Sequence, residues 1–201
     1  MKDVRVVGWS EVAGREAALV QRCAVGDEGA CAELMAEHQR MVVQLAINLL
    51  GDRDEALDLS QEVFLRVFRT IHAFRGQSGL RTWIYRIAVN QARNRHRFWR
   101  RRRKGDQISL DEHVETHGEF VCETQHTPER VLAQKELAVQ LQTALDNLPF
   151  DQRTAIVLRE VDGLSYDEIA YSLGVAVGTV KSRLTRARQA LRSELREART
   201  S

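Results

Sequence analysis

The sequence has few of the residues that mark disulfide-linked, secreted or membrane proteins. Only three cysteines occur in its 201 residues, and no two of them are spaced as CxxC. Their odd number argues against a disulfide scaffold and fits a reducing cytosol. No run of about 18 apolar residues is present, and the first residues lack the apolar core of a signal peptide. We therefore expect a cytoplasmic protein with no membrane-inserted segment.

Prolines, glycines and aromatic residues are also scarce. The chain contains two prolines and twelve glycines, too few to punctuate a many-stranded β protein, and aromatic residues make up only 6% of it. Apolar side chains at 43% suffice for packed cores, and charged side chains at 29% are typical of a well-solvated helical chain. The length fits one medium domain or two small ones. Together these values predict an all-α fold.

Known catalytic motifs are missing as well. The sequence has no P-loop, no GxSxG and no HExxH pattern, and the acids between residues 52 and 62 have no neighbouring histidine. We therefore expect that the protein is not an enzyme and uses no cofactor.

The formal net charge of +2 conceals a strong segregation of charge along the chain. Residues 93–104 carry seven arginines and one lysine without an acid, a net charge of +8. Residues 104–129 carry seven acids and one lysine (−6), and residues 177–201 carry seven basic residues and two acids (+5). A single charged run is commonly a solvated face. Two separate basic segments favour polyanion binding, because clustered Lys and Arg neutralise phosphates and release counterions.

Three segments follow one another along the chain. Residues 14–101 are expected to form a domain of four helices, because apolar helical faces are interrupted at two glycine–aspartate pairs and over residues 74–79. Residues 102–127 are acidic and polar without sustained periodicity, which predicts a flexible linker. Residues 128–201 are expected to form a second helical domain, which begins with a threonine cap, a proline and an acid.

The second domain contains a helix-turn-helix pattern. Ser165 and Glu168 are spaced as a capping box at the start of a short helix, and Gly174 supplies a left-handed turn after it. In the longer helix that follows, one apolar stripe is predicted to be buried: Val180, Leu184, Ala187 and Leu191. The opposite face carries Lys181, Ser182, Thr185, Arg186 and Gln189. A basic, hydrogen-bonding face on the second helix of such a pair is what reading the major groove requires.

This domain resembles a known family. The motifs LREVDGLSYDEIA (158–170), LGV (173–175) and VGTVKSRL (177–184) resemble region 4 of bacterial sigma-70 family sigma factors, within them the extracytoplasmic-function (group 4) class. In that family region 4 reads the promoter −35 element. By this resemblance the −35 residues are Arg159, Thr179, Lys181, Ser182, Arg183, Thr185, Arg186 and Arg188. Many relatives have arginine in place of Lys181 and an aromatic in place of Thr185, so the −35 sequence stays open.

The fourth helix of the first domain, expected over residues 80–101, combines cations with aromatic rings. One stripe on it carries Thr82, Arg86, Asn90, Arg93 and Arg97. Seven of the chain's twelve aromatic residues fall between residues 64 and 99. Cations with interleaved aromatic and amide side chains suit a strand with exposed bases, because they follow the backbone and stack on unpaired bases. For Phe64, Phe68 and Trp83, which lie at core spacing, a packing role stays open.

The first domain resembles region 2 of the same sigma factors. The motif DEALDLSQEVFL (54–65) is similar to the surface that docks on the β′ clamp of RNA polymerase, and the expected docking residues are Asp58, Gln61, Glu62 and Leu65. The motifs FRGQS (74–78) and TWIYRIAVN (82–90) are similar to the −10 reader, which captures a flipped base. The expected residues for −10 binding and melting are Phe74, Arg75, Gln77, Ser78, Thr82, Trp83, Arg86, Asn90, Arg93 and Arg97.

The resemblance covers most of the chain and implies a function. It implies a sigma factor that binds core RNA polymerase through the β′ clamp and the β subunit and directs promoter-specific transcription initiation. Such factors commonly serve a stress response and are held inactive by an anti-sigma factor. In the family, the segment between the two domains threads the active-site cleft and RNA exit path, and the acidic side chains of this segment fit a positively lined channel.

Two alternatives stay open at this point. A stand-alone helix-turn-helix transcriptional regulator would bind a palindromic duplex as a dimer without polymerase. In the linker, four residues are spaced so that they could hold a zinc ion: His113, His117, Cys122 and His126. A solvated linker without a metal is the simpler interpretation of this segment.

Overall fold

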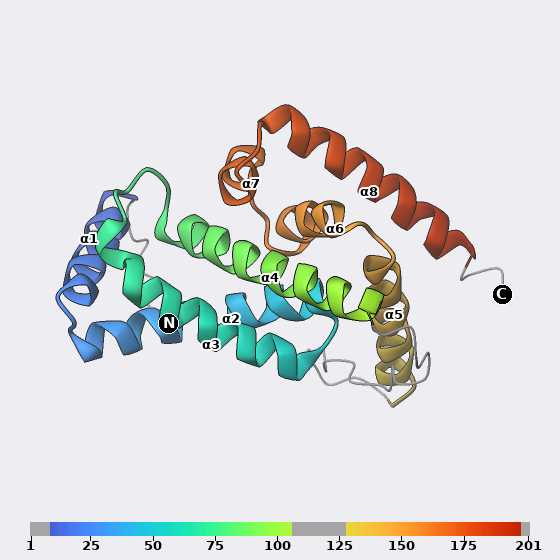
Figure 1. Cartoon of the computed structure of the whole chain (residues 1–201), viewed down its shortest axis with the longest axis horizontal. Coiled ribbons are helices and arrows are strands. Elements are labelled where there is room, and N and C mark those ends of the chain that lie inside the picture. Colours follow the sequence, from blue (N-terminus) through green and yellow to red (C-terminus); the bar gives the residue numbers. More distant parts are fainter. Residues whose placement is uncertain (1–8, 106–127, 198–201) are drawn as a thin grey trace, which may run out of the picture.

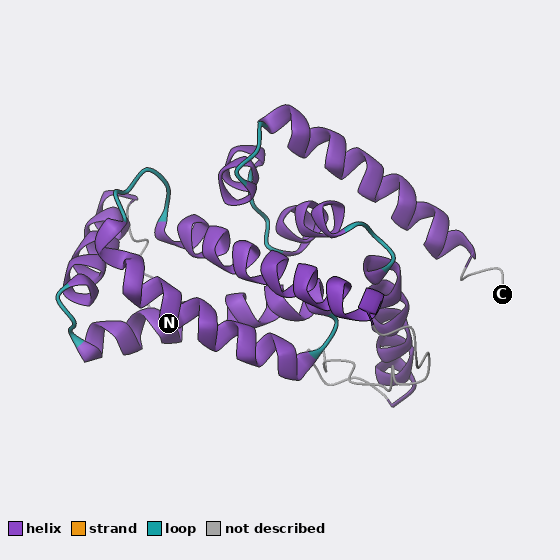
Figure 2. Ribbon diagram, in the orientation of Figure 1, coloured by secondary structure: helices purple, strands orange, loops and turns teal. Residues whose placement is uncertain are grey.

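A computed structural model describes the backbone of residues 9–105 and 128–197 and the side chains of residues 14–102 and 137–196. These segments form eight α-helices and contain no strand (Figures 1 and 2). The helices are α1 Trp9–Ala24, α2 Glu28–Leu50, α3 Arg53–Thr70, α4 Leu80–Gly105, α5 Pro128–Asp146, α6 Phe150–Ile156, α7 Tyr166–Leu173 and α8 Val177–Glu197. The predicted all-α fold is confirmed. No helix among the described residues is long and apolar enough to cross a membrane.

Local capping sets the helix ends of the N-terminal half (residues 9–105). The Asp27 carboxylate accepts from the backbone N–H of Ala30 at 3.0 Å, and Asp52 accepts from Glu55 at 2.9 Å. Between these caps, Gly51 ends α2 in the left-handed region, with φ +75° and its N–H donating to the Ile47 carbonyl. The two predicted breaks at glycine–aspartate pairs are therefore confirmed.

The core of the N-terminal half lies where α4 crosses α2 and α3, with α1 at one end (Figure 1). Leu34, Leu59 and Ile84 are at most 1% exposed there. Each such side chain contributes about 1.5–3 kcal/mol when it is fully buried. Phe64 is buried and Phe68 half-buried, with ring centroids 6.1 Å apart, so the packing role considered for these two rings is confirmed.

The C-terminal half (residues 128–197) contains the predicted helix-turn-helix in α7 and α8. Ser165 and Glu168 form the full capping box, and Gly174 adopts φ +65° at the turn. The predicted α8 stripe faces inward: Val180, Leu184 and Ala187 are at most 1% exposed, and Leu191 is half-buried. After α6 the chain continues as a π-helical turn, Val157–Val161.

The two halves pack against each other. In Figure 1, α4 lies between α2 and α3 on one side and α6 and α7 on the other. The buried Arg153 of α6 donates to the backbone oxygen of Leu49 at the end of α2, with a nitrogen–oxygen distance of 2.8 Å. The sequence predicted two domains and a linker but not this contact. The linker residues 106–127 lie outside the described part of the chain.

Candidate nucleic-acid interface and docking surface

Helix α8 presents a polar face to solvent. Besides Arg188, four predicted −35 residues are exposed on it: Lys181, Ser182, Thr185 and Arg186. The hydroxyls of Ser182 and Thr185 donate to the helix backbone, to the oxygens of Thr179 (2.9 Å) and Lys181 (3.0 Å). Within the described residues, Lys181 and Arg186 have no ion pair or hydrogen-bonded side-chain partner. Both cations are therefore available to a bound anion.

Three other predicted −35 residues are engaged inside the structure. Arg183 is half-buried and lies 2.7 Å from an Asp151 carboxylate oxygen, and Arg188 lies 2.7 Å from Glu160. Arg159 donates to the Leu164 carbonyl at 2.7 Å, and its guanidinium lies 5.1 Å from the centroid of the Tyr166 ring. In this conformation these three arginines join α6, the π-helical turn that follows it, α7 and α8 to one another.

The loop before α4, residues 74–79, carries both exposed and packed side chains. Arg75 and Gln77 are exposed, whereas Phe74 is half-buried and packs on Trp83 with ring centroids 5.3 Å apart. The Ser78 hydroxyl is buried without a hydrogen-bond partner in the described structure. Trp83 therefore supports the loop that carries the other side chains, which agrees with the packing role left open for it.

The α4 stripe, defined as Thr82, Arg86, Asn90, Arg93 and Arg97, is only partly open. Arg86, Asn90 and Arg97 are exposed. Thr82 is 3% exposed, and Arg93 is half-buried and within 3.4 Å of an Asp151 oxygen. Helices of the C-terminal half cover these two residues, which sequence periodicity alone placed on a free surface.

Helix α3 carries an exposed acidic and apolar surface, as predicted. The four expected docking residues are all exposed: Asp58, Gln61, Glu62 and Leu65. Leu65 is 55% exposed and is therefore accessible to a partner.

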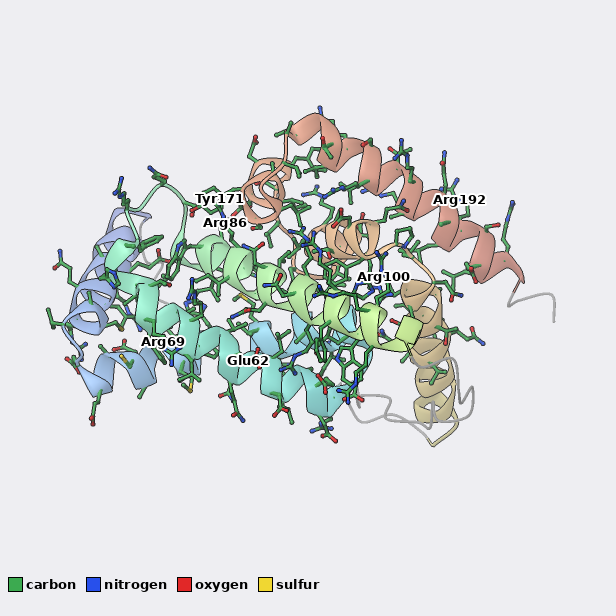
Figure 3. All side chains as sticks on the ribbon, viewed as in Figure 1. Glu62, Arg69, Arg86, Arg100, Tyr171 and Arg192 are labelled. Carbon is green, nitrogen blue, oxygen red and sulfur yellow. The ribbon has the colours of Figure 1, made fainter. Side chains whose placement is uncertain are left out.

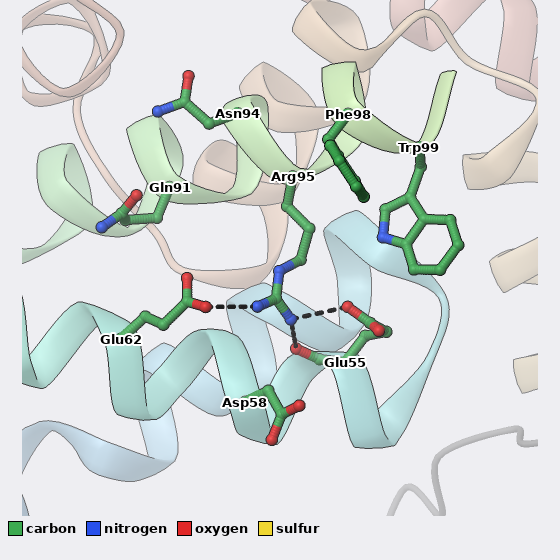
Figure 4. A pocket seen from close by; sticks show the side chains of 8 residues that line it. All are labelled: Glu55, Asp58, Glu62, Gln91, Asn94, Arg95, Phe98 and Trp99. Atoms are coloured by element: carbon green, nitrogen blue, oxygen red, sulfur yellow. Dashed lines mark hydrogen bonds and ion pairs between the residues drawn. The ribbon is translucent and has the colours of Figure 1, made fainter. Parts of the chain in front are cut away.

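A hollow of about 340 Å³ adjoins this surface between α3 and α4 (Figure 4). Arg95 reaches down from α4 and lies 2.6 Å from Glu62 and 2.7 Å from Glu55. Beside it the rings of Phe98 and Trp99 are 52% and 39% exposed. The sequence pattern does not place this part of α4 next to α3, because Arg95 pairs with residues that are 33 and 40 positions away.

A second hollow, of about 370 Å³, is lined by Asn94, Arg97, Arg100 and Arg101 at the end of α4. All three arginines are exposed. Closely spaced guanidinium groups of this kind are suited to phosphate oxygens. Of these residues only Arg97 belongs to the predicted −10 set.

The described residues contain no group of three or more His, Cys, Asp or Glu side chains arranged to hold a metal ion. His113, His117, Cys122 and His126 lie outside the described part of the chain, and so the zinc hypothesis for the linker stays a hypothesis.

The fold and its basic surfaces define an all-helical DNA-binding protein with a helix-turn-helix. Sigma-70 region 2 matches residues 34–104, and Sigma-70 region 4 matches residues 138–191. The RNA polymerase sigma-H factor of Pseudomonas aeruginosa is 38% identical over 174 residues, which cover 86% of this chain and 90% of that protein. The ECF RNA polymerase sigma-E factor of Escherichia coli K12 is 37% identical over 173 residues, with the same two coverages. The chain belongs to the sigma-70 family of RNA polymerase sigma factors, in its extracytoplasmic-function (ECF) class.

Two solved structures share the fold. CnrH, in complex with the cytosolic domain of CnrY, is 23% identical with a TM-score of 0.66, over 90% of this chain and 97% of that one. The sigma factor RpoE of Bartonella quintana, in complex with the anti-sigma factor NepR, is 27% identical with a TM-score of 0.65, over 82% and 96%. The chain is thus a sigma factor, a protein of promoter-specific transcription initiation, and sigma factors are not themselves enzymes.

Proposed function

We propose that this chain binds core RNA polymerase and divides promoter recognition between its two halves: α8 reads the −35 duplex, while the 74–79 loop and the α4 stripe capture the −10 strand. The division rests on one observation. The chain has two basic surfaces on separate structural units, one on the second helix of a helix-turn-helix and one beside a loop with packed aromatic rings. The first suits a duplex and the second suits unpaired bases.

For the −35 element, Lys181 and Arg186 contact bases or phosphates first, because they are exposed and unpaired in the described structure. Ser182 and Thr185 supply hydroxyls on the same face. Arg159, Arg183 and Arg188 join when their internal bonds are exchanged for phosphate contacts. The half-buried Thr179 joins them from the first turn of α8.

For the −10 element, the exposed Arg75, Gln77 and Asn90 provide donors and acceptors for a flipped base. Phe74 and Trp83 hold the loop in shape, and Ser78 contributes a hydroxyl with no partner in the described structure. Arg86, Arg93 and Arg97 follow the backbone of the strand, with Thr82 at the start of the stripe.

For polymerase docking, Leu65 inserts into an apolar site on the β′ clamp, and Asp58, Gln61 and Glu62 form a polar rim around it. The C-terminal half contacts the β subunit. The RpoE relative was solved with an anti-sigma factor, which supports an anti-sigma partner for this chain too. Because polymerase and promoter DNA are cytoplasmic, we place its action there, in a stress response.

Two single variants separate docking from strand opening. Asn90→Ala removes an exposed amide that contributes nothing to the core, so the affinity for core polymerase should stay within about twofold of wild type. Opening of the −10 DNA should fall roughly tenfold, as expected for the loss of one base contact. Leu65→Ala should instead weaken polymerase binding roughly five- to thirtyfold. Permanganate reactivity of −10 thymines measures opening, and fluorescence titration measures binding.

Val25→Ala is the matched control, because Val25 is an apolar residue that is 85% exposed in the connection between α1 and α2, outside the docking surface on α3. This control should leave both polymerase binding and opening of the −10 element unchanged. Equal loss of binding and opening in Asn90→Ala would contradict a base-capturing role for the α4 stripe. Duplex binding without any affinity for polymerase would instead indicate a stand-alone regulator.

A further inference from the structure

The hollow between α3 and α4 continues the docking surface of α3 onto a second helix. Its α3 side consists of Glu55, Asp58 and Glu62, and the last two belong to the expected docking set. Its α4 side includes the rings of Phe98 and Trp99, to which neither DNA reading nor docking assigns a role. A partner that lies on α3 therefore also meets these two rings.

Two of the three carboxylates in the hollow are already paired within the chain. Arg95 lies 2.6 Å from Glu62 and 2.7 Å from Glu55, and it also donates to the Glu55 backbone oxygen at 3.2 Å. The third carboxylate, Asp58, is exposed and has no ion pair or hydrogen-bonded side-chain partner within the described residues. The lining residues carry three carboxylates and one guanidinium, a net charge of −2, so the hollow attracts a cation.

Phe98 and Trp99 leave aromatic faces open beside these carboxylates. The two rings meet edge to face with centroids 6.2 Å apart, and Figure 4 shows them with Arg95 on the side of α4 that faces α3. Such faces attract cations, and they suit the planar guanidinium group especially, because it can stack on a ring. The Phe98 ring already has one contact of this kind, since the guanidinium carbon of Arg102 lies 5.9 Å from its centroid.

The charge of the hollow favours a cation of a protein over a nucleic-acid strand. Exposed rings can stack on bases, but the net negative charge of the lining repels the phosphates that accompany them. The arginines suited to phosphates lie elsewhere on α4: Arg97 and Arg100 are about 140–160° around the helix from Arg95, at an advance of about 100° per residue. The end of α4 thus has one side for phosphates and another for a cation.

We propose that an arginine side chain of the polymerase clamp enters this hollow, where the Asp58 carboxylate binds its guanidinium group and the rings of Phe98 and Trp99 stack on it. This role for the hollow rests on the proposed docking of α3, because the hollow shares Asp58 and Glu62 with that surface. Phe98 and Trp99 are then binding residues for polymerase on a helix that otherwise serves DNA.

Variants of Trp99 separate the face of the ring from its apolar bulk. Because the ring is 39% exposed near the end of α4, they should shift the midpoint of thermal unfolding by less than about 2 °C. Trp99→Leu keeps an apolar side chain but removes the aromatic face, and should weaken binding to core RNA polymerase roughly three- to thirtyfold. Trp99→Phe, the matched control, keeps an aromatic face and should stay within about twofold of wild type.

Affinity is measured by fluorescence anisotropy of the labelled full chain, titrated with core RNA polymerase. A double-mutant cycle shows whether one cation contacts both the carboxylate and the ring. Asp58→Asn should weaken binding strongly in the wild-type background, and at least about twofold less strongly in the Trp99→Leu background. Independent effects of the two substitutions would show that Asp58 and Trp99 contact different groups of polymerase, and would overturn the proposal.

Leu65→Ala distinguishes failure of the hollow from failure of the docking surface. Wild-type affinity in Trp99→Leu together with a loss in Leu65→Ala would overturn the role of the hollow and leave docking through α3 in place. Wild-type affinity in both variants would contradict docking through α3 as well. If Trp99→Phe loses as much affinity as Trp99→Leu, the aromatic face is not what binds polymerase, and the guanidinium assignment is wrong.

Strand binding provides the remaining outcome. The probe is a fluorescent oligo(dT) strand of about 15 nucleotides. We expect Trp99→Leu to bind it as the wild type does. Weaker binding of this strand by Trp99→Leu, with unchanged affinity for polymerase, would show that the rings stack on DNA, and would also overturn the proposal.

Discussion

Removing Lys181 tests how α8 reads duplex DNA. The side chain is exposed and unpaired in the described structure, so Lys181→Ala should not change folding stability. Loss of one base contact is worth about 1–3 kcal/mol, which corresponds to a roughly 5- to 150-fold weaker complex. If Lys181 contacts a phosphate instead, the loss of affinity is nearly the same for every DNA sequence. The slope of log affinity against log salt then falls by about 0.9.

Arg192 supplies the matched control on the same helix. It is exposed and lies 11 residues beyond Lys181, about 16 Å along the axis and only about 20° around it. Arg192→Ala therefore removes the same charge from the same face, beyond the part of α8 that enters the groove in a helix-turn-helix. Figure 3 shows Arg192 projecting near the end of α8.

The assay is fluorescence anisotropy on a short duplex that carries a −35 element, repeated from about 50 to 200 mM salt. We expect a clear loss of affinity for Lys181→Ala, a similar loss for Arg186→Ala, and less than about a twofold change in affinity for Arg192→Ala. Equal losses in all three variants would show that α8 attracts DNA only through its overall charge, and the reading-helix assignment would be wrong.

Three further predictions concern the framework. Arg153→Met removes three hydrogen bonds, one to the Leu49 carbonyl and two to Asp146. It should lower the free energy of unfolding, measured by urea titration, by about 2–4 kcal/mol. The loss is smaller than for a fully buried ion pair, because the Asp146 side chain is 42% exposed. Burial raises the pKa of Asp162 to about 6. Just below pH 6 the folded protein therefore keeps a proton on Asp162 that the unfolded chain has already released. The free energy of unfolding should thus be greater at acidic pH and decline as the pH rises through 6. Asp162→Asn should remove this decline. If the free energy of unfolding of Asp162→Asn depends on pH as in the wild type, Asp162 is not buried as described. Ser165→Ala breaks the capping box and should cost about 1 kcal/mol in thermal unfolding, whereas an unchanged melting temperature would show that the cap is dispensable.

Local chemistry explains why the helices were predictable. Asp27 and Asp52 cap the helices that follow them, and Gly51 and Gly174 adopt the left-handed conformation that ends a helix. Each of these signals lies within four residues of its partner. The exposed face of α8 followed in the same way from helical periodicity.

Contacts between the halves could not be predicted, because their partners are distant in sequence. Thr82 and Glu168 are 86 residues apart, and Arg153 meets the Leu49 carbonyl 104 residues away. Periodicity identified one face of α4 as polar and basic but not what covers it. For the same reason Arg183 was placed with the DNA-binding residues, without its ion pair to Asp151.

Reconstituted transcription tests the central claim most directly. Core RNA polymerase is mixed with the purified full chain on genomic DNA, and the 5′ ends of the transcripts are sequenced. We expect start sites that polymerase alone does not use, preceded by one shared pair of −35 and −10 elements at fixed spacing. Start sites identical to those of polymerase alone, together with no measurable binding between the two proteins, would contradict the account.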